Sequence, residues 1–506
     1  MSFVRTSSLN LNKILNSKFC YVEQFQTGCL SLYSYYIESD KYSVIIDPVR
    51  DIKGYLDLLE ERKSKLKYIF ETHFQADFVS GHVDLSKKTN TNIYMGPTAQ
   101  ANFNLTNLKH EEELEISNNV KIKSLHTPGH TPESTSYLLL EKTEDNSNIY
   151  KQLALFTGDT LFLGDTGRPD LASKSDITKE DLAGMLYDSV QYLKKNIEDS
   201  CYILPTHGAG SACGKNIQSG SYSTMEQQKK TNWALSNNLK KEEFIKSATT
   251  NLPTPPKYFF ENVKMNHDNI LPFDEVVEKG NKALSVDDIE NIIKDNNTKK
   301  PEERTAIIEG RDLKYVFEGF IPGSVVISLN TQFAIWSASI FNPKMPVAVI
   351  VPEGKEQEAL LRLTRTGFDN IIGYLKGGYE AWVKAGKKTD KIEVIKNKDC
   401  LNIIKGNEKN ILDVRNVPEF VNPGSFKEAT RIPLSSLIYN VEDKVINNNE
   451  NLKNNIYALC KAGTRATMAS TVLRAFGYKG DIKVLEGGID NLIKEGAILD
   501  YKESSN

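Results

Sequence analysis

The stretch Gly477-Tyr-Lys-Gly-Asp-Ile-Lys-Val-Leu-Glu-Gly-Gly488 decides the fold of the C-terminal part, because it repeats an earlier stretch, Gly367-Phe-Asp-Asn-Ile-Ile-Gly-Tyr-Leu-Lys-Gly-Gly378. The two copies are separated by the length of a small domain. An apolar, strand-like run precedes each copy, at residues 347–351 and 456–459, and a loop and a helix-like segment follow that run. This alternation predicts two related α/β domains with largely parallel sheets.

The N-terminal part has a different pattern and predicts a third, larger domain. Short β-rich runs alternate there with polar, helix-like stretches, the runs being residues 42–46, 68–70, 92–95, 137–140 and 153–156. A chain of 506 residues is too long for one ordinary core. We therefore expect three domains, at residues 19–273, 274–388 and 389–506.

The composition excludes several classes of protein. The chain has 63 Lys and Arg against 66 Asp and Glu, a net charge of −3, which argues against a chain-wide nucleic-acid or membrane-surface role. No apolar run reaches the roughly 18 residues that a membrane span requires. The six cysteines form no CxxC pair and are too sparse for a disulfide scaffold. We expect a soluble protein in a reducing compartment.

The first 18 residues have a composition of their own. They contain Arg5, Lys13 and Lys18 and no acidic residue, together with apolar residues that could form a stripe. This composition is typical of a mitochondrial presequence, but a plain N-terminal tail has the same features. The prediction for residues 1–18 is thus a presequence or a tail, and the compartment is the mitochondrial matrix or the cytoplasm.

Four motifs place His or Asp in turns that follow apolar runs. They are Thr72-His-Phe-Gln-Ala-Asp-Phe-Val-Ser-Gly-His82, Thr127-Pro-Gly-His-Thr-Pro132, Phe156-Thr-Gly-Asp-Thr160 and Pro205-Thr-His-Gly208. Loops at strand ends are where a rigid sheet can present ligands to one point. The motifs therefore predict a metal site.

The order of these motifs resembles the metallo-β-lactamase superfamily, whose first motif is normally His-x-His-x-Asp-His. The resemblance implies an αββα sandwich and carries over to His73, His130 and Asp159 as metal ligands. The chain departs from the pattern at Gln75 and at Phe78, which cannot coordinate a second ion. Two histidines and one carboxylate are the ligand set of non-haem Fe(II) oxygenases.

The superfamily branch with this one-iron set is the persulfide dioxygenases, which belong beside the glyoxalase II-like enzymes. Gly158-Asp-Thr-Leu-Phe-Leu-Gly-Asp-Thr-Gly-Arg-Pro-Asp170 and His207-Gly-Ala-Gly-Ser-Ala-Cys-Gly-Lys215 extend the similarity. It implies one Fe(II) per chain and oxidation of a small-molecule persulfide, such as glutathione persulfide, by O₂ to sulfite. Asp77 and His207 would orient ligands or substrate. Arg168 would bind a substrate carboxylate or brace its loop.

A second reactive motif, Cys460-Lys-Ala-Gly-Thr-Arg465, lies between a strand-like run and a helix-like segment. A helix N-terminus and a nearby Arg favour a thiolate and bind anions. With Ile411-Leu-Asp-Val-Arg415 and Leu485-Glu-Gly-Gly-Ile489, the motif resembles a rhodanese domain. The resemblance implies sulfur transfer to or from thiosulfate, with Cys460 as nucleophile. It implies roles for these further residues: Arg465 in catalysis, Lys461, Ala462, Gly463 and Thr464 in the sulfur-binding loop, and Asp413 and Arg415 in support.

The other repeat lacks these reactive groups. Alignment of the two repeats places Val351 opposite Cys460, Gly354 opposite Gly463 and Glu356 opposite Arg465. Glu309-Gly-Arg311 and Ile321-Pro-Gly-Ser324 still resemble rhodanese scaffold motifs. We predict a degenerate rhodanese-like domain that acts as a spacer, a dimerisation surface or a docking element.

The leading hypothesis is a persulfide dioxygenase fused to a rhodanese, acting in sulfide detoxification. One rival is a two-metal thioester hydrolase of glyoxalase II type, which Phe78 argues against. The other is a non-enzymatic persulfide sensor or sulfur-relay scaffold. A homo-oligomer is compatible with the resemblance, and the carrier thiol and the direction of sulfur transfer at Cys460 stay open.

Overall fold

The chain folds into two compact units. A computed structural model describes residues 7–144, 148–173, 176–252 and 254–501. The first unit comprises the described residues of Met1–Pro255 together with Phe259–Phe273, and the second comprises Pro256–Tyr258 and the described residues from Asp274 onward.

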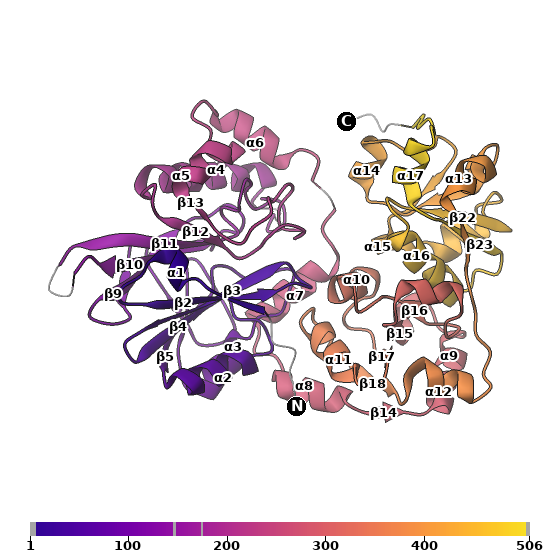
Figure 1. The fold of residues 1–506 in the computed structure, drawn as a ribbon, viewed down its shortest axis with the longest axis horizontal. Coiled ribbons are helices and arrows are strands. Elements are labelled where there is room, and N and C mark those ends of the chain that lie inside the picture. Colours follow the sequence, from indigo (N-terminus) through magenta and orange to yellow (C-terminus); the bar gives the residue numbers. More distant parts are fainter. Residues whose placement is uncertain (1–6, 145–147, 174–175, 253, 502–506) are drawn as a thin grey trace. The chain divides into compact units, whose positions relative to one another are not determined.

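One seven-stranded sheet begins the first unit, with its strands in the order of the sequence (Figure 1). Helices α2 and α3 lie against the outer face of this sheet. The elements are β1 (Ser7–Asn10), α1 (Asn12–Leu15), β2 (Tyr21–Thr27), β3 (Leu32–Ser39), β4 (Tyr42–Ile46), α2 (Lys53–Arg62), β5 (Lys65–Phe70), α3 (His82–Thr89), β6 (Ile93–Met95) and β7 (Leu105–Asn107).

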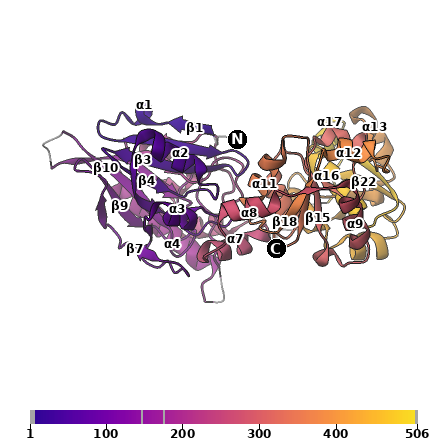
Figure 2. The same ribbon diagram turned by 90° about the horizontal axis from the view of Figure 1, so that it is seen from below.

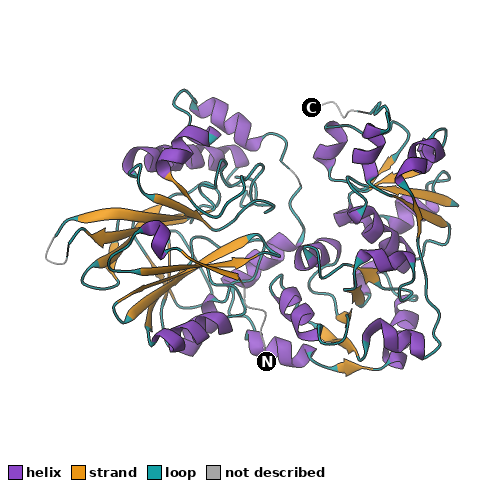
Figure 3. Cartoon of the chain, in the orientation of Figure 1, coloured by secondary structure: helices purple, strands orange, loops and turns teal. Residues whose placement is uncertain are grey.

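A six-stranded sheet in the order β13-β12-β11-β10-β9-β8 faces the first, and α4, α5 and α6 cover its other side (Figure 3). Apolar residues of both sheets, among them Ile37, Tyr137 and Phe156, form the core between them. The predicted αββα sandwich is therefore confirmed. Its remaining elements are β8 (Glu113–Glu115), β9 (Val120–His126), β10 (Thr135–Lys142), β11 (Tyr150–Gly158), α4 (Lys179–Asn196), β12 (Tyr202–Pro205), β13 (Ser223–Thr224), α5 (Met225–Thr231), α6 (Lys241–Thr249) and α7 (Tyr258–His267).

Residues 7–18, predicted as a tail or presequence, are an integral part of this sandwich. β1 pairs antiparallel with β2, and Leu11 and Leu15 are buried in the core between the sheets. The carboxylate of Glu141 accepts hydrogen bonds from the backbone N–H groups of Lys18 and Phe19. The described part of the domain therefore includes residues 7–18, which the sequence assigned to a tail or presequence, and residues 1–6 lie outside the described residues. An amphipathic stripe looks the same in a targeting segment and in a segment that packs on a core.

The second unit contains the two repeats, each with a five-stranded parallel sheet (Figure 2). The strand orders are β14-β18-β17-β15-β16 and β19-β23-β22-β20-β21, which are the same order when each repeat is numbered separately. The prediction of two related α/β domains with parallel sheets is therefore confirmed. Among the described helices of the whole chain, none has the length and apolar character needed to cross a membrane.

The middle repeat follows α8 (Phe273–Gly280). Its elements are β14 (Ala283–Leu284), α9 (Val286–Asn296), β15 (Ala306–Glu309), β16 (Val325–Val326), α10 (Phe333–Ile340), β17 (Val347–Ile350), α11 (Glu356–Thr364), β18 (Ile371–Leu375) and α12 (Gly378–Lys384). The last repeat has β19 (Glu393–Ile395), α13 (Asn397–Ile404), β20 (Ile411–Asp413), α14 (Val417–Val421), β21 (Thr430–Arg431), α15 (Leu434–Leu437), β22 (Asn455–Leu459), α16 (Thr464–Ala475), β23 (Asp481–Leu485) and α17 (Gly488–Lys494).

Candidate functional sites

The loops after β5, β9 and β11 bring His73, His130 and Asp159 together, all three fully buried. Asp159 Oδ2 lies 3.7 Å from His73 Nε2 and 3.5 Å from His130 Nε2. These separations are too long for good hydrogen bonds, but they suit ligands that each lie about 2.0–2.2 Å from one ion. Asp159 Oδ2 has no hydrogen-bond partner within the described part of the chain. The three residues therefore fit a metal ion.

Hydrogen bonds behind the two histidines fix which nitrogen faces the site. His130 Nδ1 lies 2.9 Å from the carbonyl oxygen of Arg168, so Nδ1 carries the proton and Nε2 is free to bind. His73 Nδ1 lies 3.0 Å from the hydroxyl of Thr72, which donates its own proton to Asp47. Burial lowers the pKa of His73 to about 3, so the ring is neutral, as a metal ligand must be.

His207 lies beside this group and bridges two carboxylates. Its Nδ1 is 2.7 Å from Asp159 Oδ1, and its Nε2 is 2.9 Å from Asp77 Oδ2. Burial alone would lower the pKa of His207, but the two carboxylates outweigh it and raise that pKa well above its usual range. Burial likewise raises the pKa of Asp159, but His207 outweighs it and the net pKa is lowered. His207 thus holds Asp159 ionised.

Asp77, His207 and Cys213 form a second group whose ligand atoms lie within 4.8 Å of one another. Cys213, which belongs to the Gly-rich motif that begins at His207, therefore lies against the two predicted orienting residues. Its thiol is buried, and burial raises its pKa well above the usual range. The group offers a second set of three donor atoms that the replacement of histidine by Phe78 does not remove.

The loop that carries His73 and Asp77 is clamped by α7, a contact that the sequence did not indicate. Asn266 Nδ2 donates to the carbonyl oxygens of Gln75 and Phe78, each at 2.8 Å. The backbone N–H of Ser80 donates to Asn266 Oδ1 at 2.8 Å. Phe78 itself is fully buried. Asn266 is more than 180 residues away in the chain, so only the folded structure could reveal this clamp.

Arg168 is held by an acidic neighbour. Its guanidinium makes a bidentate pair with Asp170, with contacts of 2.7 Å from Nε and 2.6 Å from Nη2. The residue is 2% exposed. This geometry favours the bracing role over substrate binding, because two of its nitrogens already contact a carboxylate.

In the last domain, Cys460 follows β22 directly and is almost fully buried. The backbone N–H of Gly463 donates to Cys460 Sγ at 3.1 Å, and α16 begins at Thr464. Gly463 has a φ of +98°, which lets the loop turn back over the sulfur. The sulfur therefore lies at the start of a helix of 12 residues, as the sequence predicted.

The predicted supporting residues form a buried network beneath this loop. Arg415 Nη2 contacts Asp413 Oδ2 at 2.6 Å and donates to the carbonyl of Gly424 at 2.7 Å. Ser425 donates to the same carboxylate at 2.8 Å. These contacts brace the chain around the loop. Arg465, predicted to bind anions, is instead paired with Glu419 on α14.

The middle domain has the same backbone arrangement without the sulfur. Val351 follows β17 directly, as Cys460 follows β22. Gly378 and Gly488 both have a φ of +57°, and a Cβ on either would collide with the carbonyl group of Val351 or Cys460 respectively. Val351 therefore occupies the place of Cys460, in a cradle of the same shape.

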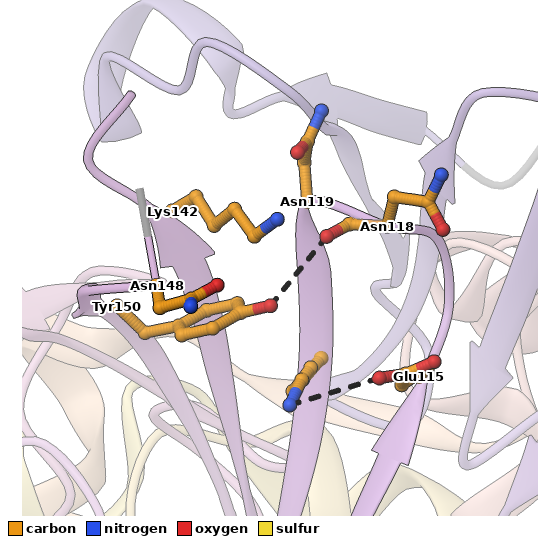
Figure 4. A pocket seen from close by; sticks show the side chains of 7 residues that line it. Glu115, Asn118, Asn119, Lys142, Asn148 and Tyr150 are labelled. Carbon is orange, nitrogen blue, oxygen red and sulfur yellow. Dashed lines mark hydrogen bonds and ion pairs between the residues drawn. The ribbon is translucent and has the colours of Figure 1, made fainter. Parts of the chain in front are cut away.

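A polar pocket elsewhere in the first unit is lined by residues that include Asn118, Lys142 and Tyr150, whose hydroxyl lies 3.5 Å from the carbonyl of Asn118 (Figure 4). It lies where β9 and β11 begin, whereas His130 and Asp159 lie beyond the ends of the same strands. This pocket is thus separate from the candidate metal site.

Comparison with known families agrees with this geometry. Residues 27–143 match the family model of the metallo-beta-lactamase superfamily, and residues 285–385 and 396–495 each match that of the rhodanese-like domain. The chain therefore contains a metallo-β-lactamase domain followed by two rhodanese-like domains, all of them domains of enzyme families.

The individual proteins that this chain resembles include two hydrolases and one metallo-beta-lactamase of known structure. The probable polyketide biosynthesis zinc-dependent hydrolase PksB of Bacillus subtilis is 27% identical over 193 residues, 37% of this chain and 77% of that protein. The cytoplasmic hydroxyacylglutathione hydrolase of Arabidopsis thaliana is 26% identical over 196 residues, 36% of this chain and 73% of that protein. A crystal structure of a metallo-beta-lactamase from Staphylococcus aureus subsp. aureus COL has a TM-score of 0.60 and 28% identity, and the match covers 71% of this chain and 99% of that one.

Proposed function

We propose that the first domain is a mononuclear Fe(II) persulfide dioxygenase. The observation that carries the proposal is the buried set of two histidines and one carboxylate, in which Asp159 Oδ2 has no hydrogen-bond partner among the described residues. The reaction is RSSH + O₂ + H₂O → RSH + SO₃²⁻ + 2H⁺. When bound, iron supplies the redox chemistry and open positions for substrate and O₂.

The protein side chains would hold the ligands in one orientation. His130 keeps its proton on Nδ1, toward the Arg168 carbonyl, so that Nε2 faces the site. His207 donates to Asp159 Oδ1 and leaves Oδ2 for the ion. The Asn266 clamp keeps the backbone of Gln75 and Phe78 fixed and so limits movement of His73.

We propose further that Cys460 carries sulfur between a persulfide and sulfite. Its thiolate attacks the outer sulfur of RSSH, which forms the Cys460 persulfide and releases RSH. Sulfite then takes the outer sulfur, so that thiosulfate leaves and the Cys460 thiolate is restored. The Gly463 N–H, 3.1 Å from Sγ, and the start of α16 would stabilise negative charge on the sulfur.

The test of the metal site is His130→Ala in the full chain. Wild type loaded with Fe(II) should hold one iron and consume O₂ with a low-molecular-weight persulfide, and the variant should lose both. His110→Ala, at an exposed histidine, is the matched control. Retention of iron and O₂ uptake by His130→Ala would refute the site.

A two-metal hydrolase remains a second candidate, favoured by the donor atoms of Asp77, His207 and Cys213. The PksB and hydroxyacylglutathione hydrolase relatives are named as hydrolases. His207 Nε2 and Asp77 Oδ1 have no hydrogen-bond partner among the described residues, whereas His207 Nδ1 lies 2.7 Å from Asp159 Oδ1. Two zinc ions per chain, with hydrolysis of a hydroxyacylglutathione and no O₂ uptake, would establish this alternative.

A further inference from the structure

The cation predicted to face anions at Cys460 is already bound by an acid. Arg465 Nη1 lies 2.6 Å from Glu419 Oε2, and Nη2 lies 2.8 Å from Glu419 Oε1. The side chains are only 14% and 26% exposed, respectively. A bidentate pair at such distances is among the stronger ion pairs that proteins form. The guanidinium therefore reaches the loop with its charge largely balanced.

The two residues hold each other in the charged state. Burial alone would raise the pKa of Glu419, but Arg465 outweighs it and that pKa is lowered. Burial alone would lower the pKa of Arg465, but Glu419, with smaller contributions from Cys460 and Asp413, leaves it raised. The charge of Arg465 therefore interacts electrostatically with the Cys460 sulfur while the guanidinium is paired with Glu419. Lys461 is the other cation of the loop, and it is exposed to solvent.

Glu419 is itself anchored to the scaffold of the domain. Its carbonyl oxygen accepts a hydrogen bond from Arg415 Nη1 at 3.0 Å, and its side chain accepts one from the backbone N–H of Asn416 at 3.1 Å. The carboxylate is therefore held in place beside Arg465. A bound oxyanion would have to share Arg465 with it.

The middle domain lacks the cation of this pair. Glu356 stands where Arg465 stands, each five residues after the position that holds or lacks the sulfur. An acid is present in both repeats, because Glu318 and Glu419 each lie four residues before the proline of a Pro-Gly-Ser stretch. The acid can therefore pair with a loop arginine at this position in the repeat that has Cys460 but not in the middle one.

We propose that Glu419 sets the selectivity of Cys460 by weakening the binding of oxyanions at Arg465. The inference rests on the proposed sulfur transfer and concerns the same site. Sulfite and thiosulfate both carry oxyanion charge beside the reacting sulfur, whereas in the loading step Cys460 attacks a persulfide that need carry no oxyanion. Glu419 would therefore raise KM for sulfite and thiosulfate and leave loading by a persulfide unaffected.

The test is Glu419→Gln in the full chain, because glutamine can still accept the Asn416 hydrogen bond. KM for thiosulfate, with cyanide as acceptor, and KM for sulfite, with the Cys460 persulfide as donor, should each fall about tenfold, the effect of one freed charge-assisted contact. The rate of persulfide loading should stay within about twofold of wild type on the same argument. Asp288→Asn is the matched control, since Asp288 caps α9 in the same way, far along the chain from the loop.

The double variant Glu419→Gln/Arg465→Gln separates charge balance from packing. The gain in oxyanion affinity should vanish in it, because the freed guanidinium is gone. An unchanged or raised KM for both oxyanions in Glu419→Gln, or a gain that persists in the double variant, would overturn the proposal.

A binding measurement keeps this outcome distinct from failure of the proposed transfer. Sulfate, an unreactive oxyanion, should protect Cys460 from iodoacetamide at about tenfold lower concentration in Glu419→Gln than in wild type at constant ionic strength, as followed by peptide mass spectrometry. Absence of any sulfur transfer in wild type would end the proposed function but leave this measurement valid. Equal protection in both proteins would refute the role of Glu419.

Discussion

The two rhodanese-like domains have the same buried scaffold and differ in the loop above it. Asp413, Arg415 and Ser425 in the last domain correspond to a second network in the middle domain, formed by Glu309, Arg311 and Ser324. In each, the arginine pairs with the acid and donates to a glycine carbonyl, and the serine donates to the acid. The middle domain keeps this network although it has no cysteine in the loop. The network therefore serves the fold, and the two domains differ in the loop residues above it.

The largest expected difference between the two domains is the effect of removing Cys460. Cys460→Ser should reduce thiosulfate formation from sulfite and a persulfide by about 10³-fold or more, because no other described group can form the persulfide there. Thiosulfate can be measured by ion chromatography. O₂ uptake should be unchanged. Transfer that survives the substitution would show that the middle domain or another cysteine carries sulfur.

The second-largest expected effect is a loss of stability on removal of the scaffold acid, and it should be equal in both domains. Asp413→Ala and Glu309→Ala each leave a buried arginine without its partner, which typically costs about 3–5 kcal/mol. Hydrogen exchange of β20 and β15, read by mass spectrometry, should show a similar loss of local stability. Loss in β20 alone would mean that the scaffold of the middle domain is not equivalent to that of the last.

The middle domain should also respond to pH through its acid. Burial raises the pKa of Glu309 above the ordinary value of 4.5 and outweighs the opposing effect of Arg311, so just above pH 4.5 Glu309 binds a proton more strongly in the folded domain than in the unfolded chain. The contribution of Glu309 to stability must therefore fall as the pH rises through this window. The free energy of local opening of β15, measured by hydrogen exchange, should therefore decrease with rising pH in wild type relative to Glu309→Gln. Parallel pH profiles would contradict this account.

The smallest effect is expected from an attempt to restore the missing sulfur. Val351→Cys, in a Cys460→Ser background, should give less than about 1% of wild-type transfer, because Glu356 places an acid where the active loop has Arg465. Adding Glu356→Arg should raise the yield of persulfide on residue 351, as measured by mass spectrometry. A rate close to wild type with Val351→Cys alone would show that the cradle is sufficient.

Much of this organisation could be predicted from sequence because it is local. The strands and helices of both repeats follow from runs of apolar residues, and the candidate ligands His73, His130 and Asp159 lie in turns of recognisable composition. Contacts between distant segments could not be predicted in this way. Asn266 clamps the Phe78 loop from α7, and Glu419 reaches Arg465 from a separate helix.

The N-terminal segment shows a different limit. Its composition suits a presequence, yet Leu11 and Leu15 pack in the core. The local sequence shows that this segment has an apolar stripe, but it does not show which surface the stripe packs against. That surface is formed by strands far along the chain. The approach of Cys213 to Asp77, which lies far earlier in the chain, could not be predicted from local patterning either.

The paired glycines Gly378 and Gly488 have a consequence for mutational surveys. Any side chain at either position meets a backbone carbonyl, so a variant library scored for protein abundance should be depleted at both sites to a similar degree. Only one of the two domains has a cysteine at the start of this loop. Intolerance to substitution at these positions therefore measures the geometry of a turn, and a library scored in this way would assign equal importance to the loop that has the cysteine and to its counterpart without one.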